Sequence, residues 1–447
     1  METMTQKKQK GEAARDWSTL PIGEVISPTR PRVSPAEKPK LPFIGMEHVE
    51  AHTMKLLGTV PAATMKSSSV HFQPGDVLYG RLRPYLNKVY RPDFEGLCSA
   101  EFIVFPSTPD IDTKYLQYFL NSYDFVSFAT HLNEGDRPRV DFKQIAPYPF
   151  PLAPLPEQRR IVSAIETQLG RLDAAVARLH AAKANLKRYK QAVLKAAVEG
   201  TLGTVPSPTK EETGQEMLER LLNQRRAQWS GRGKYKEPAA PDLGELQELP
   251  DGWAWATVEQ ISTKVVDGVH KKPNYVEAGV PFITVRNLTA GPGISFETLK
   301  FITEEDHAEF IKRANPEFGD VLITKDGTLG VVRFVATDKV FSIFVSVAMI
   351  KPVDRSMGEY LSVALTSPVV QVQMVPKGSG LQHIHLEDLR ADCVPIPPMS
   401  IQRCIVEEYK SYERQIQEIE STLDAQLDQS ARLRQAVLTR AFEGRLV

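Results

Sequence analysis

A heptad repeat of apolar residues that occurs twice places the strongest constraint on this chain. One apolar row recurs at every seventh residue from Pro156 to Leu202, and the same register returns from Ser400 to Leu446. A seven-residue apolar period with no interior proline predicts a long helix that packs along a second helix. At about 1.5 Å per residue, about 44 residues would form a rod of roughly 65 Å. The predicted coiled-coil seam is Ile165, Leu172, Leu179, Leu186 and Val193 in the first helix and Tyr409, Ile416, Leu423 and Val437 in the second.

A second apolar row is needed to complete such a seam, and it is less regular than the first. Two sets of residues can supply it. Leu169 and Val176 lie four places after residues of the first row, at the start of the helix. Farther on, the row three places after the first is mostly apolar once Gln168 is passed, and we expect it to form the other half of the seam: Ala175, Ala182, Tyr189 and Ala196.

The rest of the chain is duplicated as well. Gln191-Ala192-Val193-Leu194 recurs as Gln435-Ala436-Val437-Leu438, an offset of 435 − 191 = 244 residues. Gly75-Asp76-Val77-Leu78 recurs as Gly319-Asp320-Val321-Leu322 at the same offset, 319 − 75 = 244. Repetition of whole segments at a fixed spacing indicates an internal tandem duplication.

Each copy begins with a segment of short β-like runs separated by Gly and Pro, with one helix expected from Thr113 to about Phe128 in the first copy. The predicted class is therefore α+β, with two similar mixed α/β domains separated by two long helices. We expect a disordered N-terminal tail at 1–15, a first domain at 16–153, a first long helix at 154–203, a linker with a short helix at 204–250, a second domain at 251–396 and a second long helix at 397–447.

The duplication also favours one direction of helix pairing. If the helices form an antiparallel coiled coil, the linker closes a short gap, and the two domains lie at opposite ends of the rod about a pseudo-twofold axis. Parallel pairing would place both domains at one end and would force the linker to run back along the rod. We expect the antiparallel arrangement, and the parallel one remains an alternative at this stage.

Composition limits the partners and the compartment. Lys plus Arg total 55 and Asp plus Glu total 55, so any nucleic-acid surface must be a local patch. Three cysteines without a Cys-x-x-Cys pair argue against a disulfide scaffold or a zinc module and favour a reducing compartment. No apolar run approaches the roughly 18 residues that span a bilayer, and the N-terminus lacks a signal-peptide core. We therefore expect a cytoplasmic protein without membrane contact.

The sequence contains no convincing catalytic motif. Gly327-Thr328-Leu329-Gly330 lacks the lysine of a phosphate-binding loop, and no Asn-Pro-Pro-Tyr methyltransferase motif occurs. A nuclease-like set can be assembled from Asp93, Asp112 and Lys114, but Asp112 stands where a helix cap is expected. His383-Ile384-His385 has no cysteine or carboxylate cluster in sequence to support a metal. We predict no catalytic residue and no metal site.

Several loops instead combine basic, amide and aromatic side chains. Arg81 to Lys88 follows a predicted strand and contains no acidic residue, and Glu134 to Arg139 corresponds in place to Gly378 to His383 of the second copy. Such side chains can donate hydrogen bonds to phosphates and to base edges. The candidate DNA-binding residues are Arg81, Arg83, Tyr85, Asn87, Lys88, Arg137 and Arg139 in the first copy and His270, Lys271, Lys272, Lys325, Ser379, Gln382 and His383 in the second.

Three further motifs carry a family resemblance. Pro154-Leu155-Pro156-Glu157-Gln158 precedes the first long helix, Pro397-Pro398-Met399-Ser400-Ile401-Gln402 precedes the second, and Ala441-Phe442-Glu443-Gly444-Arg445-Leu446 ends it. With these motifs in this order, the chain resembles the specificity subunit of a type I restriction–modification system from about Asp16 to Val447. Ile401 stands where the first copy has Glu157, and Val198 where the second has Phe442, so we expect the two helix bases to differ in their contacts.

The resemblance implies two target-recognition domains that each read one half of a bipartite site in double-stranded DNA. It implies that the paired helices set the half-site spacing and dock two methyltransferase subunits, to which restriction and translocation subunits can add. S-adenosylmethionine, ATP and Mg²⁺ would then belong to those partners, and this chain would hold no cofactor. Three rival interpretations stay open: a stand-alone DNA-binding or regulatory protein without a methyltransferase partner, a nuclease, and a protein-binding scaffold.

Overall fold

Two compact units make up the chain, and each contains a segment of both long helices. The computed structural model describes residues 17–28, 31–202, 211–231, 233–297, 300–377 and 382–446. Unit 1 comprises Met1–Ala181 and Leu423–Val447, and unit 2 comprises Ala182–Thr422. The predicted tail at 1–15 lies outside the described residues.

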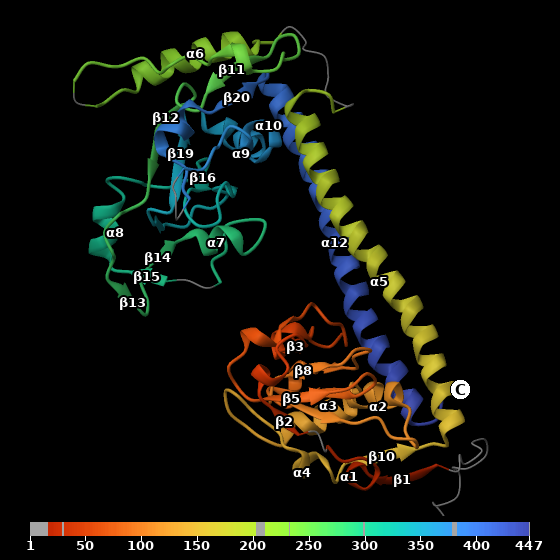
Figure 1. The fold of residues 1–447 in the computed structure, drawn as a ribbon. Helices are drawn as coiled ribbons and strands as arrows, with labels where there is room; N and C mark the ends of the chain where they lie inside the picture. The colour runs from red at the N-terminus through yellow and green to blue at the C-terminus, as the bar shows by residue number, and fades with distance from the viewer. Residues whose placement is uncertain are drawn as a thin grey trace, which may run out of the picture. The chain divides into compact units, whose positions relative to one another are not determined.

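The long helices form where the heptads predicted them. They are α5, Leu155–Val198, and α12, Met399–Phe442, each of 44 residues (Figure 1). Gly200 follows α5 and Gly444 follows α12, with φ of 69° and 73°. Glycine adopts this left-handed conformation without a side-chain clash, and it is the usual residue just beyond a helix end.

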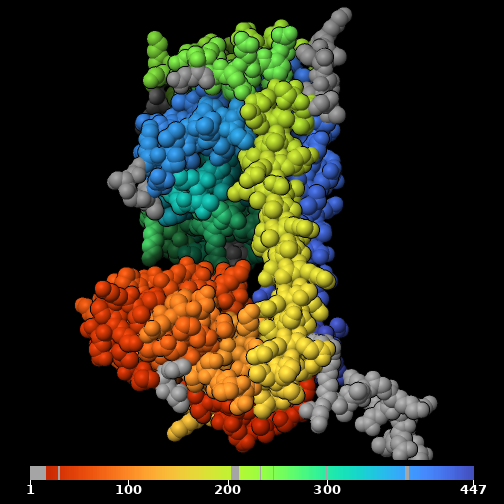
Figure 2. Space-filling model, turned by 45° about the vertical axis from the view of Figure 1, so that its right-hand side comes forward, coloured from red at the N-terminus to blue at the C-terminus, as the bar shows by residue number. Residues whose placement is uncertain are grey.

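The two helices pair antiparallel. In unit 1, Asp173 of α5 accepts a hydrogen bond from Arg434 of α12 at 2.7 Å. In unit 2, Lys190 of α5 donates to Glu413 of α12 at 3.2 Å. Residue numbers therefore rise along α5 while they fall along α12, which confirms the antiparallel prediction and excludes the parallel alternative. Figure 2 shows the two helices packed side by side, α5 in yellow and α12 in blue.

Burial along the helices follows the predicted first row but not the predicted second row. Ile165, Leu186, Val193, Tyr409 and Ile416 are buried, whereas Leu172, Leu179, Leu423 and Val437 are half-buried. The row three places on is not the second half of the seam, because Ala175, Ala182 and Tyr189 are exposed. The row four places on turns inward instead along the whole helix: Leu169, Val176, Lys183, Lys190 and Ala197.

Two lysines in this inner row explain why the apolar pattern of the sequence did not identify it as the second row of the seam. Lys183 and Lys190 are half-buried, and Lys190 reaches Glu413 with its ammonium group. A lysine can cover apolar surface with its methylene stem while its charged head reaches a partner or water. An interior position of this kind carries no apolar signal in the sequence.

Among the described residues, unit 1 has three small sheets and four short α-helices beside the long ones. A five-stranded sheet has the order β2-β5-β8-β3-β4, a three-stranded sheet has the order β7-β6-β9, and β1 pairs with β10. The strands are β1 (Ser18–Pro21), β2 (Arg32–Val33), β3 (Pro42–Ile44), β4 (Val60–Pro61), β5 (Ser69–Phe72), β6 (Val77–Gly80), β7 (Val89–Tyr90), β8 (Gly96–Cys98), β9 (Phe102–Phe105) and β10 (Pro149–Leu152), and two one-turn helices are α1 (Ile22–Val25) and α4 (Phe142–Ile145).

The single helix predicted from Thr113 to Phe128 is interrupted. The structure has α2, Thr113–Leu120, and α3, Tyr123–His131. Asp112 caps α2, and its carboxylate accepts hydrogen bonds from the Lys114 and Tyr115 amides at 2.9 and 3.3 Å. The break comes where Ser122 takes an extended ψ of 149°, which starts α3 in a new direction.

An aromatic cluster joins the helices to the first globular segment. Tyr115 and Phe119 of α2 lie 5.1 and 5.4 Å from the Phe442 ring of α12, measured between ring centroids. Leu438 of α12 and Ile165 of α5 are fully buried in the same core. The long helices are therefore part of the core of unit 1.

Unit 2 repeats this plan with additions. One four-stranded sheet has the order β12-β19-β16-β17, another has the order β13-β15-β14-β18, and β11 pairs with β20. The strands are β11 (Ala254–Thr257), β12 (Ser262–Asp267), β13 (Tyr275–Val276), β14 (Val280–Ile283), β15 (Lys300–Ile302), β16 (Val321–Thr324), β17 (Val332–Phe334), β18 (Ser342–Ile343), β19 (Val347–Pro352) and β20 (Cys393–Ile396), and the helices are α6 (Gly214–Ala227), α7 (Val285–Thr289), α8 (Glu304–Phe310), α9 (Gly358–Thr366), α10 (Pro368–Gln371) and α11 (Leu386–Ala391).

Matching contacts in the two units confirm the duplication. Phe43 pairs in parallel with Leu97 in unit 1, as Phe282 does with Ser342 in unit 2. Gln158, near the start of α5, donates to the Ala153 carbonyl at 2.8 Å, and Gln402, near the start of α12, donates to the Pro397 carbonyl at 2.9 Å. The two mixed α/β segments and their long helices therefore follow one plan, as the α+β prediction required.

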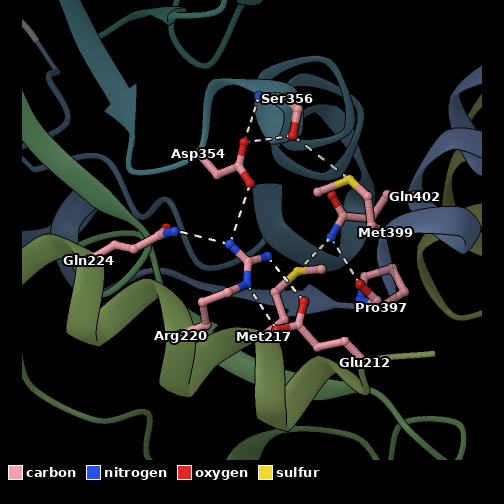
Figure 3. A network of polar contacts seen from close by, with 9 residues as sticks. All are labelled: Glu212, Met217, Arg220, Gln224, Asp354, Ser356, Pro397, Met399 and Gln402. Carbon is pink, nitrogen blue, oxygen red and sulfur yellow. Dashed lines mark hydrogen bonds and ion pairs between the residues drawn. The ribbon is translucent and has the colours of Figure 1, made fainter.

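The helix in the predicted linker packs into unit 2. The Met217 and Leu221 side chains of α6 are fully buried in the core of that unit. Figure 3 shows Arg220 of α6 between Glu212 and Asp354, with its guanidinium 2.9 Å from the Glu212 carboxylate and 3.6 Å from that of Asp354. A Cβ on Gly214 would come within 2.0 Å of the Ile396 carbonyl oxygen, so the helix start approaches the sheet too closely for any other residue.

Candidate nucleic-acid interface

Two of the predicted loops of unit 1 are held together by main-chain pairing. Leu82 and Arg139 form an antiparallel bridge. The Arg83 amide donates to the Pro138 carbonyl at 2.7 Å, and the Val140 amide donates to the Arg81 carbonyl at 3.0 Å. Arg81 adds a side-chain link, because its Nε donates to the Val140 carbonyl at 3.1 Å. Residues 81–88 and 134–139 therefore form one surface.

Unit 2 contains the same arrangement 244 residues later. Asp326 and His383 form an antiparallel bridge. The Ile384 amide donates to the Lys325 carbonyl at 2.9 Å, as the Val140 amide does to Arg81 in unit 1. The duplication thus preserves the pairing of two loops although their side chains differ.

The side chains of the first loop pair divide into outward and inward groups. Tyr85, Arg137 and Arg139 are exposed, and Arg81, Arg83 and Lys88 are half-buried. One of the hydrogen-bond donors of Lys88 is already used, because its ammonium donates to the Met46 carbonyl at 2.6 Å. Arg83 takes a left-handed conformation with φ of 52°, which turns the chain within the 81–88 loop just before the turn Pro84–Leu86.

Asn87 is the one candidate of unit 1 that the structure removes from the interface. Its side chain is 3% exposed. Its amide nitrogen donates to the Asn121 carbonyl at 3.2 Å, and its amide oxygen accepts from the Asn121 side chain at 2.9 Å. A buried amide with both groups bonded holds the loop to the break between α2 and α3, and it cannot reach a base edge.

The candidates of unit 2 show a similar division. His270, Lys271, Lys272 and Gln382 are exposed. His383 is half-buried, and its ring centroid lies 4.5 Å from that of His385. Ser379 lies outside the described residues.

Lys325 is a second correction, because only 11% of its side chain is exposed. Its ammonium lies 3.2 Å from the Asp326 carboxylate and 3.7 Å from that of Asp267. The arrangement makes Lys325 an internal support of the loop rather than a direct DNA contact.

Three residues at these surfaces were missed by sequence reasoning. Glu101 binds the Arg139 guanidinium through both carboxylate oxygens, at 2.6 and 3.0 Å. Asp267, which is 4% exposed, binds Arg313, whose guanidinium donates to both the carboxylate and the main-chain carbonyl. Arg313 follows α8 and stands 46 positions from Asp267, so no local pattern connects the two.

Asp112 and Lys114 of the nuclease-like set have structural partners. Among the described residues, no group of three or more His, Cys, Asp and Glu side chains could hold a metal ion. Asp112 of the nuclease-like set uses its carboxylate to cap α2, and Lys114 is paired with Glu166 at 2.6 Å. Within the part of the chain that the structure describes, no helix is both long enough and apolar enough to span a membrane.

Comparison with known proteins gives consistent relatives. The type I restriction enzyme EcoDI specificity subunit of Escherichia coli is 28% identical over 200 residues, which cover 44% of this chain and 45% of that one. The EcoBI specificity subunit of the same species is 27% identical over 304 residues, covering 66% of this chain and 58% of that one. The chain therefore spans about half the length of these curated relatives.

Solved structures share the fold. A chain from the structure titled "Structural basis underlying complex assembly and conformational transition of the type I R-M system" aligns with a TM-score of 0.71 at 20% identity, covering 98% of this chain and all of that one. The HsdS subunit of Thermoanaerobacter tengcongensis aligns with a TM-score of 0.51 at 20% identity, covering 96% of this chain and 97% of that one.

A family model, described as "Type I restriction modification DNA specificity domain", matches residues 14–181 and 251–429. The two matched segments fall in the two copies of the duplication, and together they cover more than half of the chain. This chain belongs to the family of type I restriction–modification DNA specificity domains.

Proposed function

We propose that this chain is the DNA-recognition subunit of a type I restriction–modification complex, and that each unit reads one half of a bipartite target. The duplicated loop pair carries this proposal: the Leu82–Arg139 bridge of unit 1 and the Asp326–His383 bridge of unit 2 occupy equivalent positions. A repeated scaffold with different side chains is what a reader of two different half-sites requires.

Recognition by such loops would come from hydrogen bonds to base edges, with phosphate contacts fixing the register of the protein on the duplex. The exposed cations Arg137 and Lys272 suit phosphates, whereas Lys271 is also paired with Glu309 at 3.5 Å. The zero formal net charge of the chain agrees with local contact surfaces and argues against a uniformly basic DNA-binding protein.

The subunit would act without catalysis of its own. Methylation would be carried out by two methyltransferase subunits docked on α5 and α12, which would hold S-adenosylmethionine, and restriction and translocation subunits would use ATP and Mg²⁺. Both long helices run through both units, so their length would set the spacing of the half-sites.

Methylation mapping tests the proposal. Cells that carry this chain and its neighbouring methyltransferase should show a methylated motif of two short sequences separated by a fixed non-specific spacer. Exchange of residues 134–139 should alter one of the two sequences and leave the other and the spacer unchanged. A continuous motif, or methylation that persists without this chain, would contradict the proposal.

A further inference from the structure

One arginine in each unit is held by an acidic residue along one edge of its guanidinium. In unit 1, the Nε and Nη2 atoms of Arg139 donate to the two carboxylate oxygens of Glu101, at 3.0 and 2.6 Å. This is the side-on, bidentate geometry that fixes a planar guanidinium most firmly. About half of the Arg139 side chain, 52%, remains exposed.

Arg313 of unit 2 is held along the same edge. Its Nε donates to the Asp267 carbonyl at 3.1 Å, and its Nη2 donates to the Asp267 carboxylate. Asp267 is the last residue of β12 and its side chain is buried, so the anchor is rigid, while 47% of the Arg313 side chain is exposed.

Both pairs lie beside equivalent positions of the duplicated loops. The Glu101 carbonyl accepts a hydrogen bond from the Arg81 amide at 2.9 Å. The Asp267 carboxylate lies 3.7 Å from the ammonium of Lys325, which occupies the place of Arg81 in the second copy. The two arginines come from different parts of their units, yet each is fixed next to the surface proposed to read DNA.

The remaining donors of these arginines point to one type of ligand. A guanidinium has five N–H donors, and the acid uses Nε and one hydrogen of Nη2. Within the described residues, Nη1 of Arg139 and of Arg313 makes no hydrogen bond. One hydrogen on each Nη therefore forms a fork at the outer end, which matches the O6 and N7 acceptors of guanine in the major groove.

The attached acid also limits what else the arginine can do. A carboxylate bonded to the guanidinium offsets its charge, so the pair gains less from the polyanionic backbone than a lone cation does. It also fixes the rotamer, which lowers the entropic cost of a directional contact. Both effects favour base readout over phosphate binding.

We propose that Arg139 and Arg313 each read a guanine, one in each half-site, and that Glu101 and Asp267 are their positioning residues. This inference rests on the proposed function as a DNA-recognition subunit. Other paired arginines differ: Nη1 of Arg220 donates to Gln224 and lies 3.6 Å from Asp354, and Arg226, a residue of α6 that is paired with Glu237, is not part of the bridged loops.

Selection of duplexes from a randomised library tests the inference. The full chain, co-expressed with its neighbouring methyltransferase, is compared with the Arg139→Lys and Arg313→Lys variants. Lysine keeps the charge but loses the fork. We expect each variant to lose on the order of tenfold of the preference for guanine at one position of one half-site. The other half-site and the dependence of affinity on salt should stay unchanged.

Arg226→Lys is the matched control, because Arg226 is also held by a carboxylate and is 56% exposed. It should leave every base preference unchanged. If Arg139→Lys and Arg313→Lys behave like this control, or if each weakens all positions of both half-sites alike, the inference is wrong. If the unaltered chain selects no bipartite site, the proposed function itself fails, which is a separate result.

The positioning role has its own readout. Glu101→Gln removes a negative charge from the DNA-facing surface, so general electrostatics predicts tighter binding to non-specific duplex. The inference predicts in addition that the guanine preference of that half-site weakens, because Arg139 loses its bidentate anchor. Tighter non-specific binding with full guanine preference would overturn the role of Glu101.

Discussion

Leu82 and Arg139 form a main-chain bridge between two loops of unit 1, and the bridge between Asp326 and His383 repeats it in unit 2. Main-chain pairing fixes the relative position of two loops without using their side chains. The side chains can then change while the scaffold stays the same. Under the proposed function, this separation of scaffold from readout would allow a duplicated chain to recognise two different half-sites.

Arg137 should contribute affinity but little specificity. Its side chain is exposed and, among the described residues, has no hydrogen-bond or ion-pair partner, so its full charge is available to a phosphate. We expect Arg137→Ala to weaken binding of all duplexes alike and to make the slope of log K against log salt shallower by about one. The exposed Arg178 of α5 is the control, and Arg178→Ala should leave DNA binding unchanged. A change in base preference in Arg137→Ala would argue for direct readout.

Asn121 should support the first loop through Asn87. Asn121→Ala leaves the buried Asn87 amide oxygen without its 2.9 Å donor. An unsatisfied buried group costs about 1–3 kcal/mol, so urea unfolding of unit 1 should show a loss of that size. Gln117→Ala on the preceding helix α2 is the comparison, because the Gln117 side chain is only half-buried. Equal stability of the two variants would show that the amide pair contributes nothing.

The helix α6 should be required for the stability of unit 2. Met217 is fully buried, and its truncation to alanine should cost about 2–5 kcal/mol of unfolding free energy. Gln215 lies on the exposed side of the same helix, and Gln215→Ala should have little effect. Urea unfolding followed by tryptophan fluorescence reports mainly on unit 2, which holds Trp229, Trp253 and Trp255. A tether without a structural role would give identical curves for both variants.

Asp392 should make the stability of unit 2 depend on pH. Burial, aided by the nearby Asp388 charge, raises the pKa of Asp392 from 3.8 to about 7. Because the folded state holds the proton more tightly, this stabilisation is complete below about pH 4 and is lost as the pH rises to about 7. The difference amounts to at most about 4 kcal/mol.

The Asp392→Asn variant tests this linkage, because its side chain has no charge to bury. Its unfolding free energy should exceed that of the unaltered chain at pH 7.5 and approach it near pH 4. Asp338→Asn, at an exposed position, should not alter the pH profile. Parallel profiles for the unaltered chain and Asp392→Asn would rule out the linkage.

The long helices should set the half-site spacing. Insertion of one heptad into both helices, between Ala181 and Ala182 and between Thr422 and Leu423, keeps the seam in register and adds about 10 Å. At about 3.4 Å per base pair, the spacer should lengthen by about three pairs while both half-site sequences persist. The control is the same insertion between Glu237 and Pro238, outside the helices. Methylation mapping that finds an unchanged spacer in the helix variant would refute this role.

The heptad period made the two long helices predictable, but it did not predict which of their residues are buried. Ile165 and Leu186 lie inside, as their spacing indicated, because an apolar side chain at a regular helical position gains from leaving water. Tyr189 satisfied the same rule and is 49% exposed, whereas Lys190 failed it and is half-buried. The sequence of the segment at 204–250 predicted a helix but not what the helix packs against, because Met217 is buried by strands that lie far along the chain.

The site shows the same limit more sharply. The sequence pointed to loops rich in donors, and the structure brings these loops together at equivalent places. It also turns Asn87 and Lys325 inward, where Asn121 and Asp267 hold them. No sequence pattern identified Arg313 as a candidate site residue, because its partner Asp267 becomes its neighbour only when β12 and α8 fold together.

The sequence by itself determined the two long helices and the duplication, favoured one pairing direction and pointed to the candidate loops, because periodic spacing and repetition are properties of order along the chain. Only the tertiary structure decided which lysines complete the seam, that α6 belongs to the core of unit 2, and which arginines are fixed by acids. Those outcomes depend on contacts between residues distant in sequence, whose burial and charge pairing exist only after folding.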